Sequence, residues 1–179
     1  YRWLLEEARV PADRIMFAGD SAGGGLVLSV LGAARDAGMP MPAGGVMWSP
    51  WVDLSDSFSG TWTSNQKTDF LPRDIAHSFA VGYAGTEHTL REASPCSVEL
   101  DAGLPPLLIE CGDAECLHDQ VEALVQRAEA VEGMDVEFHA CEGMVHVFPL
   151  FYPFCKAESD PVQAFERMAQ FGDRVWGTL

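Results

Sequence analysis

The stretch IMFAGDSAGGG, residues 15–25, constrains this chain more than any other. Its apolar first half predicts a short buried strand, and its glycine-rich second half predicts the start of a helix. Between them, Gly19, Ser21 and Gly23 form a G-x-S-x-G pattern. A serine on so tight a turn needs neighbours without side chains, because strand and helix nearly collide there. The turn exposes the hydroxyl and directs backbone N–H groups at an oxyanion, so we predict a nucleophile at Ser21 and an oxyanion donor at the Ala22 N–H.

The rest of the chain alternates between helical and strand-like patterns. Apolar runs predict strands over residues 45–49, 106–111 and 136–141. Apolar residues at three- and four-residue steps predict helices over 22–34 and 117–131. A last helix is predicted from Asp160 as N-cap, with Pro161 at its first position and Gln163 placed for a capping box. Such alternation implies an α/β fold with a mostly parallel sheet and helices on both faces.

Candidate catalytic residues follow three of the predicted strands directly. Ser21 follows the first, Asp113 and Glu115 follow the third, and His146 follows the fourth. Reactive groups gather at the carboxyl ends of strands in parallel sheets, so these side chains are expected at one edge. A serine, a histidine and a carboxylate brought together there form the arrangement used for nucleophilic acyl transfer.

Composition narrows the function classes further. A chain of 179 residues with 47% hydrophobic and 21% charged residues is most simply one globular domain, residues 1–179. Its formal net charge of −16 argues against nucleic acid and anionic membrane surfaces, and no apolar run is long enough to span a bilayer. The five cysteines are odd in number and form no C-x-x-C pair, which favours a reducing, cytoplasmic location. His139, Cys141 and His146 fit no zinc spacing, so we expect no metal.

Four motifs together carry a family resemblance. They are GDSAGG at 19–24, SPWVDL at 49–54, LPPLLI at 104–109 and GMVHVF at 143–148. In this order they resemble the hormone-sensitive-lipase-like branch of the α/β-hydrolases, particularly its bacterial carboxylesterases. The resemblance implies the α/β-hydrolase fold, with chain order serine, acid, histidine. It also implies a carboxylesterase for small or short-chain acyl esters, without organic cofactor or metal. Residues 53–95 are then expected to contribute to a cap, and a homodimer is a further expectation.

Two departures from the family pattern stand out. The family places an H-G-G-G loop, which supplies most of the oxyanion hole, well before the elbow, and this chain begins too late to contain it. We therefore interpret the chain as a C-terminal portion that lacks the N-terminal half of the sheet and part of the cap. The second departure is Cys116, where many relatives have proline in a D-P-L-x-D stretch. Counting back from Leu117 and Asp119 places Glu115 on the catalytic aspartate and makes Asp113 a turn former, although aspartate is the commoner triad acid.

Other interpretations remain open at this point. Nothing in the sequence excludes that the same triad acts on a lactone, carbamate, thioester or peptide bond instead. Some members of the fold bind a ligand without catalysis, and the chain also fits an inactive interaction fragment. Asp20 is interpreted as an elbow-stabilising residue, and Asp53 either braces loops near the site or forms a turn. Five aromatic residues are divided between core and pocket, namely Trp48, Trp51, Phe58, Trp62 and Phe70.

Overall fold

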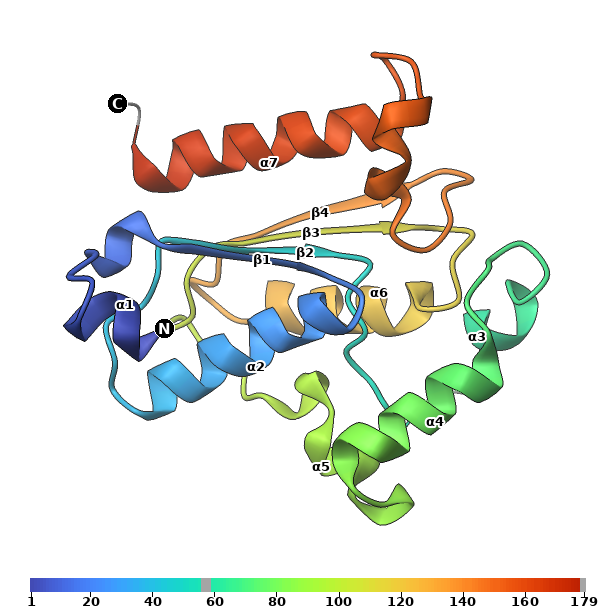
Figure 1. Ribbon diagram of the computed structural model, residues 1–179, viewed down its shortest axis with the longest axis horizontal. Coiled ribbons are helices and arrows are strands. Elements are labelled where there is room, and N and C mark those ends of the chain that lie inside the picture. Colours follow the sequence, from blue (N-terminus) through green and yellow to red (C-terminus); the bar gives the residue numbers. More distant parts are fainter. Residues whose placement is uncertain (56–58, 178–179) are drawn as a thin grey trace.

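Four parallel strands form the centre of the computed structural model, which describes residues 1–55 and 59–177 (Figure 1). They are β1 (Met16–Asp20), β2 (Gly44–Trp48), β3 (Leu107–Gly112) and β4 (Val136–Cys141). Their order in the sheet is β1-β2-β3-β4, and Gly45 of β2 is aligned with Phe17 of β1 and Leu107 of β3. All carboxyl ends therefore meet at one edge, and the predicted parallel sheet is confirmed.

Helices cover both faces of this sheet, because parallel strands need a crossover between one strand and the next. Helices α2 (Ala22–Asp36) and α6 (His118–Glu129) lie on one face, and α7 (Asp160–Trp176) lies on the other (Figure 1). The short helix α1 (Arg2–Glu6) and a 3₁₀ turn, η1 (Ala12–Arg14), precede β1. The predicted strands and long helices are thus all present, with ends shifted by a few residues.

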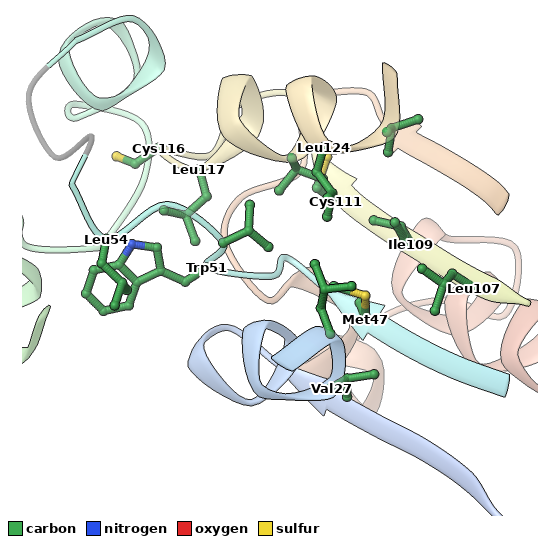
Figure 2. Close-up of a cluster of buried hydrophobic side chains, with 14 of the residues drawn as sticks. Val27, Met47, Trp51, Leu54, Leu107, Ile109, Cys111, Cys116, Leu117 and Leu124 are labelled. Atoms are coloured by element: carbon green, nitrogen blue, oxygen red, sulfur yellow. The ribbon is translucent and has the colours of Figure 1, made fainter. Parts of the chain in front are cut away.

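Alternation along the strands divides the core between the two faces. Met47 and Ile109 join the larger cluster, which lies between the sheet and α2 and α6 (Figure 2). Val46 and Leu108 point the other way and pack against Phe171 of α7. Because both faces of β2 and β3 are buried, these strands are apolar almost throughout.

The long connection between β2 and β3 carries several short helices. Helix α4 (Arg73–Ala84) is 12 residues long. It is accompanied by α3 (Thr61–Ser64), η2 (Glu87–Thr89), α5 (Leu90–Ala93) and η3 (Pro95–Ser97). In Figure 1, α4 and α5 lie beyond α2 and α6, on the side of the sheet away from α7.

The start of α7 differs from the sequence prediction. Ser159 is its N-cap residue, Asp160 is already helical, and within the described residues no side chain makes a capping hydrogen bond to the helix. The Gln163 side chain donates to the Glu158 carbonyl oxygen at 2.8 Å, outside the expected capping box. A 3₁₀ segment, η4 (Phe148–Phe154), comes between β4 and α7 and carries the chain from the site to this helix.

Candidate active site

The turn between β1 and α2 holds Ser21 in a strained conformation, with φ 52° and ψ −121°. A Cβ atom on Gly19 would lie 2.5 Å from both the carbonyl carbon and oxygen of Gly23, so Gly19 must lack a side chain. A Cβ atom on Gly23 meets no described atom within 4 Å. The expectation that Gly23 also needs to lack a side chain is therefore wrong for the described residues. The close contact is between Gly19 and the backbone carbonyl group of Gly23.

The elbow is attached to the neighbouring strand through its backbone. The Ser21 N–H donates to the Trp48 carbonyl oxygen at 2.9 Å, at the end of β2. The Ser21 carbonyl oxygen accepts from the Trp51 N–H at 2.9 Å and from the Gly25 N–H at 3.1 Å. These bonds hold the serine on two sides, so its hydroxyl projects from the carboxyl edge of the sheet. The Ala22 N–H is in the first turn of α2, where backbone N–H groups lack intrahelical partners.

His146 lies on the loop after β4 and meets Ser21 across the sheet edge. Its Nε2 atom is 2.9 Å from the Ser21 Oγ atom. The serine hydroxyl donates this bond when Nε2 carries no proton. The histidine residue is only 3% exposed, and Phe70 lies beside its ring with centroids 6.0 Å apart. Val147, directly after it, has a φ of 52°, which marks a sharp turn at this point of the loop.

The two candidate acids have different surroundings. Glu115 is fully buried, and its Oε1 atom lies 4.0 Å from the His146 Nδ1 atom. Neither atom has a hydrogen-bond partner among the residues that the structure describes. Asp113 is exposed, and its Oδ1 atom accepts from the Gly143 N–H at 2.7 Å. Asp113 thus ties the turn after β3 to the turn after β4. Of the two candidate acids, Glu115 is the one whose carboxylate lies near the imidazole.

Ser49 is a site residue whose role was not predicted from the sequence. Its side chain is buried, and its hydroxyl donates to the second carboxylate oxygen of Glu115, Oε2, at 2.6 Å. The same hydroxyl accepts from the Val147 N–H at 2.9 Å. The Gly112 N–H also donates to Oε2, at 3.0 Å. The position of Ser49 directly after β2, at the edge shared with Ser21, was the available signal.

An apolar cavity of about 380 Å³ opens beside the serine. Ser21 and Ala22 form one part of its wall, and Ile75, Phe79 and Tyr83 of α4 form another. These three residues lie four apart, so they share one face of the helix. The remaining wall is also mostly apolar, from Leu26, Trp51, Leu54, Leu71, Pro72, Ala76, Ala80 and Pro95.

The other candidate residues divide between the core, the cavity and surface turns. Trp62 is a core residue, only 2% exposed, whereas Trp51 lines the cavity. Phe58 lies outside the described residues. Asp53 accepts from the backbone N–H and hydroxyl of Ser55, at 2.8 and 2.6 Å, which is a turn geometry.

Within the described ranges, no group of three or more His, Cys, Asp or Glu side chains is placed to hold a metal ion. None of the helices described is both long and apolar enough to cross a membrane.

Known proteins share this architecture. A family model of the alpha/beta hydrolase fold matches residues 1–150. An acetyl-hydrolase from Streptomyces hygroscopicus is 42% identical over 154 residues, which cover 86% of this chain and 50% of that protein. The crystal structure of an esterase from the bacterial hormone-sensitive lipase (HSL) family has a TM-score of 0.87 and 38% identity, covering 99% of this chain and 58% of that one. The structure of EstE5 soaked by p-nitrophenyl butyrate has a TM-score of 0.86 and 36% identity, covering 98% of this chain and 57% of that one.

The parallel sheet with a serine on its strand-to-helix elbow defines the class of protein. The chain belongs to the α/β-hydrolase family, as the match over residues 1–150 shows, and its structural relatives include an esterase of the bacterial HSL family. It spans about half the length of the curated relatives it matches. That an H-G-G-G oxyanion loop precedes Tyr1 stays a prediction.

Proposed function

We propose that this chain carries the catalytic triad of a serine carboxylesterase acting on small or short-chain acyl esters. Ser21 is the nucleophile, His146 the general base and Glu115 the orienting acid. The observation that carries the proposal is the 2.9 Å contact between Ser21 Oγ and His146 Nε2, formed by residues 125 positions apart in the chain. A nucleophile and a base within hydrogen-bond reach are the signature of an activated serine.

The reaction follows from these positions. His146 Nε2 takes the hydroxyl proton as Ser21 Oγ attacks the ester carbonyl carbon, and the carbonyl oxygen becomes an oxyanion. The Ala22 N–H, directly after the nucleophile, is one donor to that oxyanion. Collapse of the intermediate expels the alcohol, which takes the proton from the imidazolium and leaves an acyl-serine. Water then repeats the same steps, releases the carboxylic acid and restores Ser21.

Glu115 has the role of fixing the imidazole and stabilising its cation. One of its oxygens, Oε2, is held by Ser49 and Gly112, which leaves Oε1 directed at His146 Nδ1. The 4.0 Å separation is longer than a hydrogen bond. Catalytic contacts are often loose before substrate binds and tighten in the complex, so this separation is compatible with the role.

The cavity beside Ser21 supports an apolar substrate group. Its volume of about 380 Å³ lies within the range of small-molecule pockets, and its walls offer almost no polar group. An acyl or alcohol chain of a few carbons gains free energy there by leaving water. We also propose that residues 53–95 belong to the cap of a single domain, because Ile75, Phe79 and Tyr83 of α4 line this cavity.

The test uses the complete enzyme that contains these residues. Ser21→Ala and His146→Ala are each expected to lower kcat for p-nitrophenyl butyrate, by about a million-fold on the scale of serine hydrolase triads. His88→Ala, an exposed histidine away from the site, is the matched control and is expected to keep full activity. Retention of most of the activity by Ser21→Ala would end the proposal.

A substrate panel and a covalent label separate the alternatives. Lactone, carbamate, thioester and peptide substrates, compared with butyrate esters by kcat/KM, identify the preferred acyl group. A fluorophosphonate probe labels Ser21 only if His146 activates it, so a non-catalytic binding protein stays unlabelled. The cytoplasmic location and the homodimer remain predictions, to be read from cell fractionation and from light scattering.

A further inference from the structure

One segment holds the backbone of the turn that carries Glu115. Residues 61–69, which we call the clamp segment, donate side-chain hydrogen bonds to four successive carbonyl oxygens of residues 113–116. The Asn65 Nδ2 atom donates to the Asp113 and Glu115 oxygens at 2.9 and 3.0 Å. The other two bonds are from Thr68 Oγ1 to the Ala114 oxygen, at 3.2 Å, and from Thr61 Oγ1 to the Cys116 oxygen, at 2.9 Å. The acid turn therefore takes its conformation partly from a segment distant in sequence.

The last residue of the clamp segment reaches both sides of the site. Asp69 is 8% exposed. Its Oδ2 atom accepts from the Cys116 N–H at 2.8 Å, directly after Glu115. Its Oδ1 atom accepts from the His146 N–H at 3.1 Å and from the Phe70 N–H at 2.9 Å. A single carboxylate thus links the backbone of the base to the backbone beside the acid.

Satisfying a buried carboxylate requires hydrogen bonds, but it does not require these particular partners. Glu115 and His146 lie on loops after two different strands, β3 and β4, and loops are the more mobile parts of a fold. The Asp113–Gly143 bond and the Ser49 hydroxyl also join these loops, but the bonds of Asp69 are the ones made to the His146 N–H itself and to the residue next to Glu115. Asp69 therefore contributes directly to the separation between the acid and the base. A catalytic arrangement is sensitive to this separation, since a displacement of about 1 Å can cost about 100-fold in rate.

We propose that Asp69 is a positioning residue that sets the geometry of the Glu115–His146 pair, with Asn65 holding the acid turn. This inference rests on the triad proposed above. Asp69 bonds to backbone N–H groups and does not line the cavity beside Ser21. Its removal therefore acts on the chemical step more than on substrate binding.

The test compares Asp69→Ala with a matched control in the complete enzyme. Gln120 is also 8% exposed, and its Oε1 atom accepts from the Val52 and Asp53 N–H groups at 2.9 and 2.8 Å. Gln120→Ala therefore removes backbone hydrogen bonds of the same kind, which go to residues 52 and 53 and not to the loops that carry Glu115 and His146. The measurements are kcat and KM for p-nitrophenyl butyrate, with the urea unfolding midpoint of each variant.

Asp69→Ala is expected to lower kcat by about 100-fold with little change in KM, whereas Gln120→Ala loses comparable stability and keeps its kcat. Asp69→Asn keeps the side chain's size but turns its NH₂ group toward at least one of the backbone N–H groups. The kcat of Asp69→Asn is expected to fall less than that of Asp69→Ala. If Asp69→Ala does not fold, Asp69→Asn still tests the proposal. Asn65→Asp sets a carboxylate oxygen against two carbonyl oxygens and is expected to lower kcat as well.

A folded Asp69→Ala enzyme with wild-type kcat would overturn the proposal. A kcat loss equal to that of Gln120→Ala would also overturn it, because it would make Asp69 a support of the fold alone. The triad proposal is tested separately, by the kcat of Ser21→Ala. Turnover by that variant would contradict the esterase mechanism, whatever the result for Asp69.

Discussion

Replacing Glu115 by glutamine tests the choice of acid through a single atom. The amide keeps the size of the side chain, and its oxygen still accepts from the Ser49 hydroxyl and the Gly112 N–H, which hold Oε2 at 2.6 and 3.0 Å. The NH₂ group then occupies the Oε1 position, 4.0 Å from the His146 Nδ1 atom. A donor facing Nδ1 favours the tautomer whose proton is on Nε2, and that nitrogen no longer accepts the Ser21 proton.

The expected fall in kcat is about 10⁴-fold, the loss caused by a wrong tautomer in a serine triad, or about 5 kcal/mol of transition-state stabilisation. The fold is expected to stay intact, because both bonds to Oε2 survive. Asp113→Asn is the matched control, since its amide oxygen can still accept from the Gly143 N–H and the side chain is exposed. The assay is kcat for p-nitrophenyl butyrate with far-UV circular dichroism. If Asp113→Asn shows the large fall and Glu115→Gln does not, the assignment of the acid is refuted.

Three further predictions concern stability and thiol reactivity. Gly19→Ala sets a methyl group 2.5 Å from the Gly23 carbonyl and should cost about 1–3 kcal/mol in urea unfolding, whereas Gly23→Ala should cost little. Arg167→Met leaves the buried Glu110 carboxylate without its ion-pair partner and should cost about 3–5 kcal/mol at pH 8. Burial already raises the pKa of Glu110, so this cost should shrink as pH falls and the carboxyl protonates; a pH-independent cost contradicts this. Of the five cysteines, Cys155 is exposed, whereas burial raises the thiol pKa of Cys96, Cys111, Cys116 and Cys141. Iodoacetamide at pH 8 should therefore label Cys155 first, and Cys155→Ser should remove the fast phase of labelling.

Much of the sheet and the elbow could be predicted because their signals are local. The apolar runs of β2 and β3 are strands buried on both faces, and such strands need no partner in the sequence to be recognised. The elbow combines a glycine pattern with a strand and a helix, and Gly19 is required there for a steric reason that lies within five residues. His146 was predicted as the candidate base from its place directly after a strand, within the GMVHVF motif.

Errors arose where a residue's surroundings are set by the tertiary structure. Gly23 belongs to the same pattern as Gly19, but the sequence does not show which of the two carries the steric constraint. The N-terminus of α7 was misplaced by one residue, since both Ser159 and Asp160 are good N-cap residues. Ser49 was quoted within a motif without a role, because its partners Glu115 and Val147 lie 66 and 98 positions away.

The segment between β2 and β3 shows most clearly why the site could not be predicted completely. Its Ser, Thr, Asp and aromatic residues read as an irregular insertion, because polar side chains that bond to a distant backbone leave no periodic pattern. In the structure, one part of it, α4, lines the cavity beside Ser21, while another part, residues 61–69, donates to the turn that carries Glu115. Under the triad and the positioning role proposed above, this one insertion shapes the substrate pocket and positions the acid. Substitutions in its two parts should then separate into effects on substrate preference and effects on kcat.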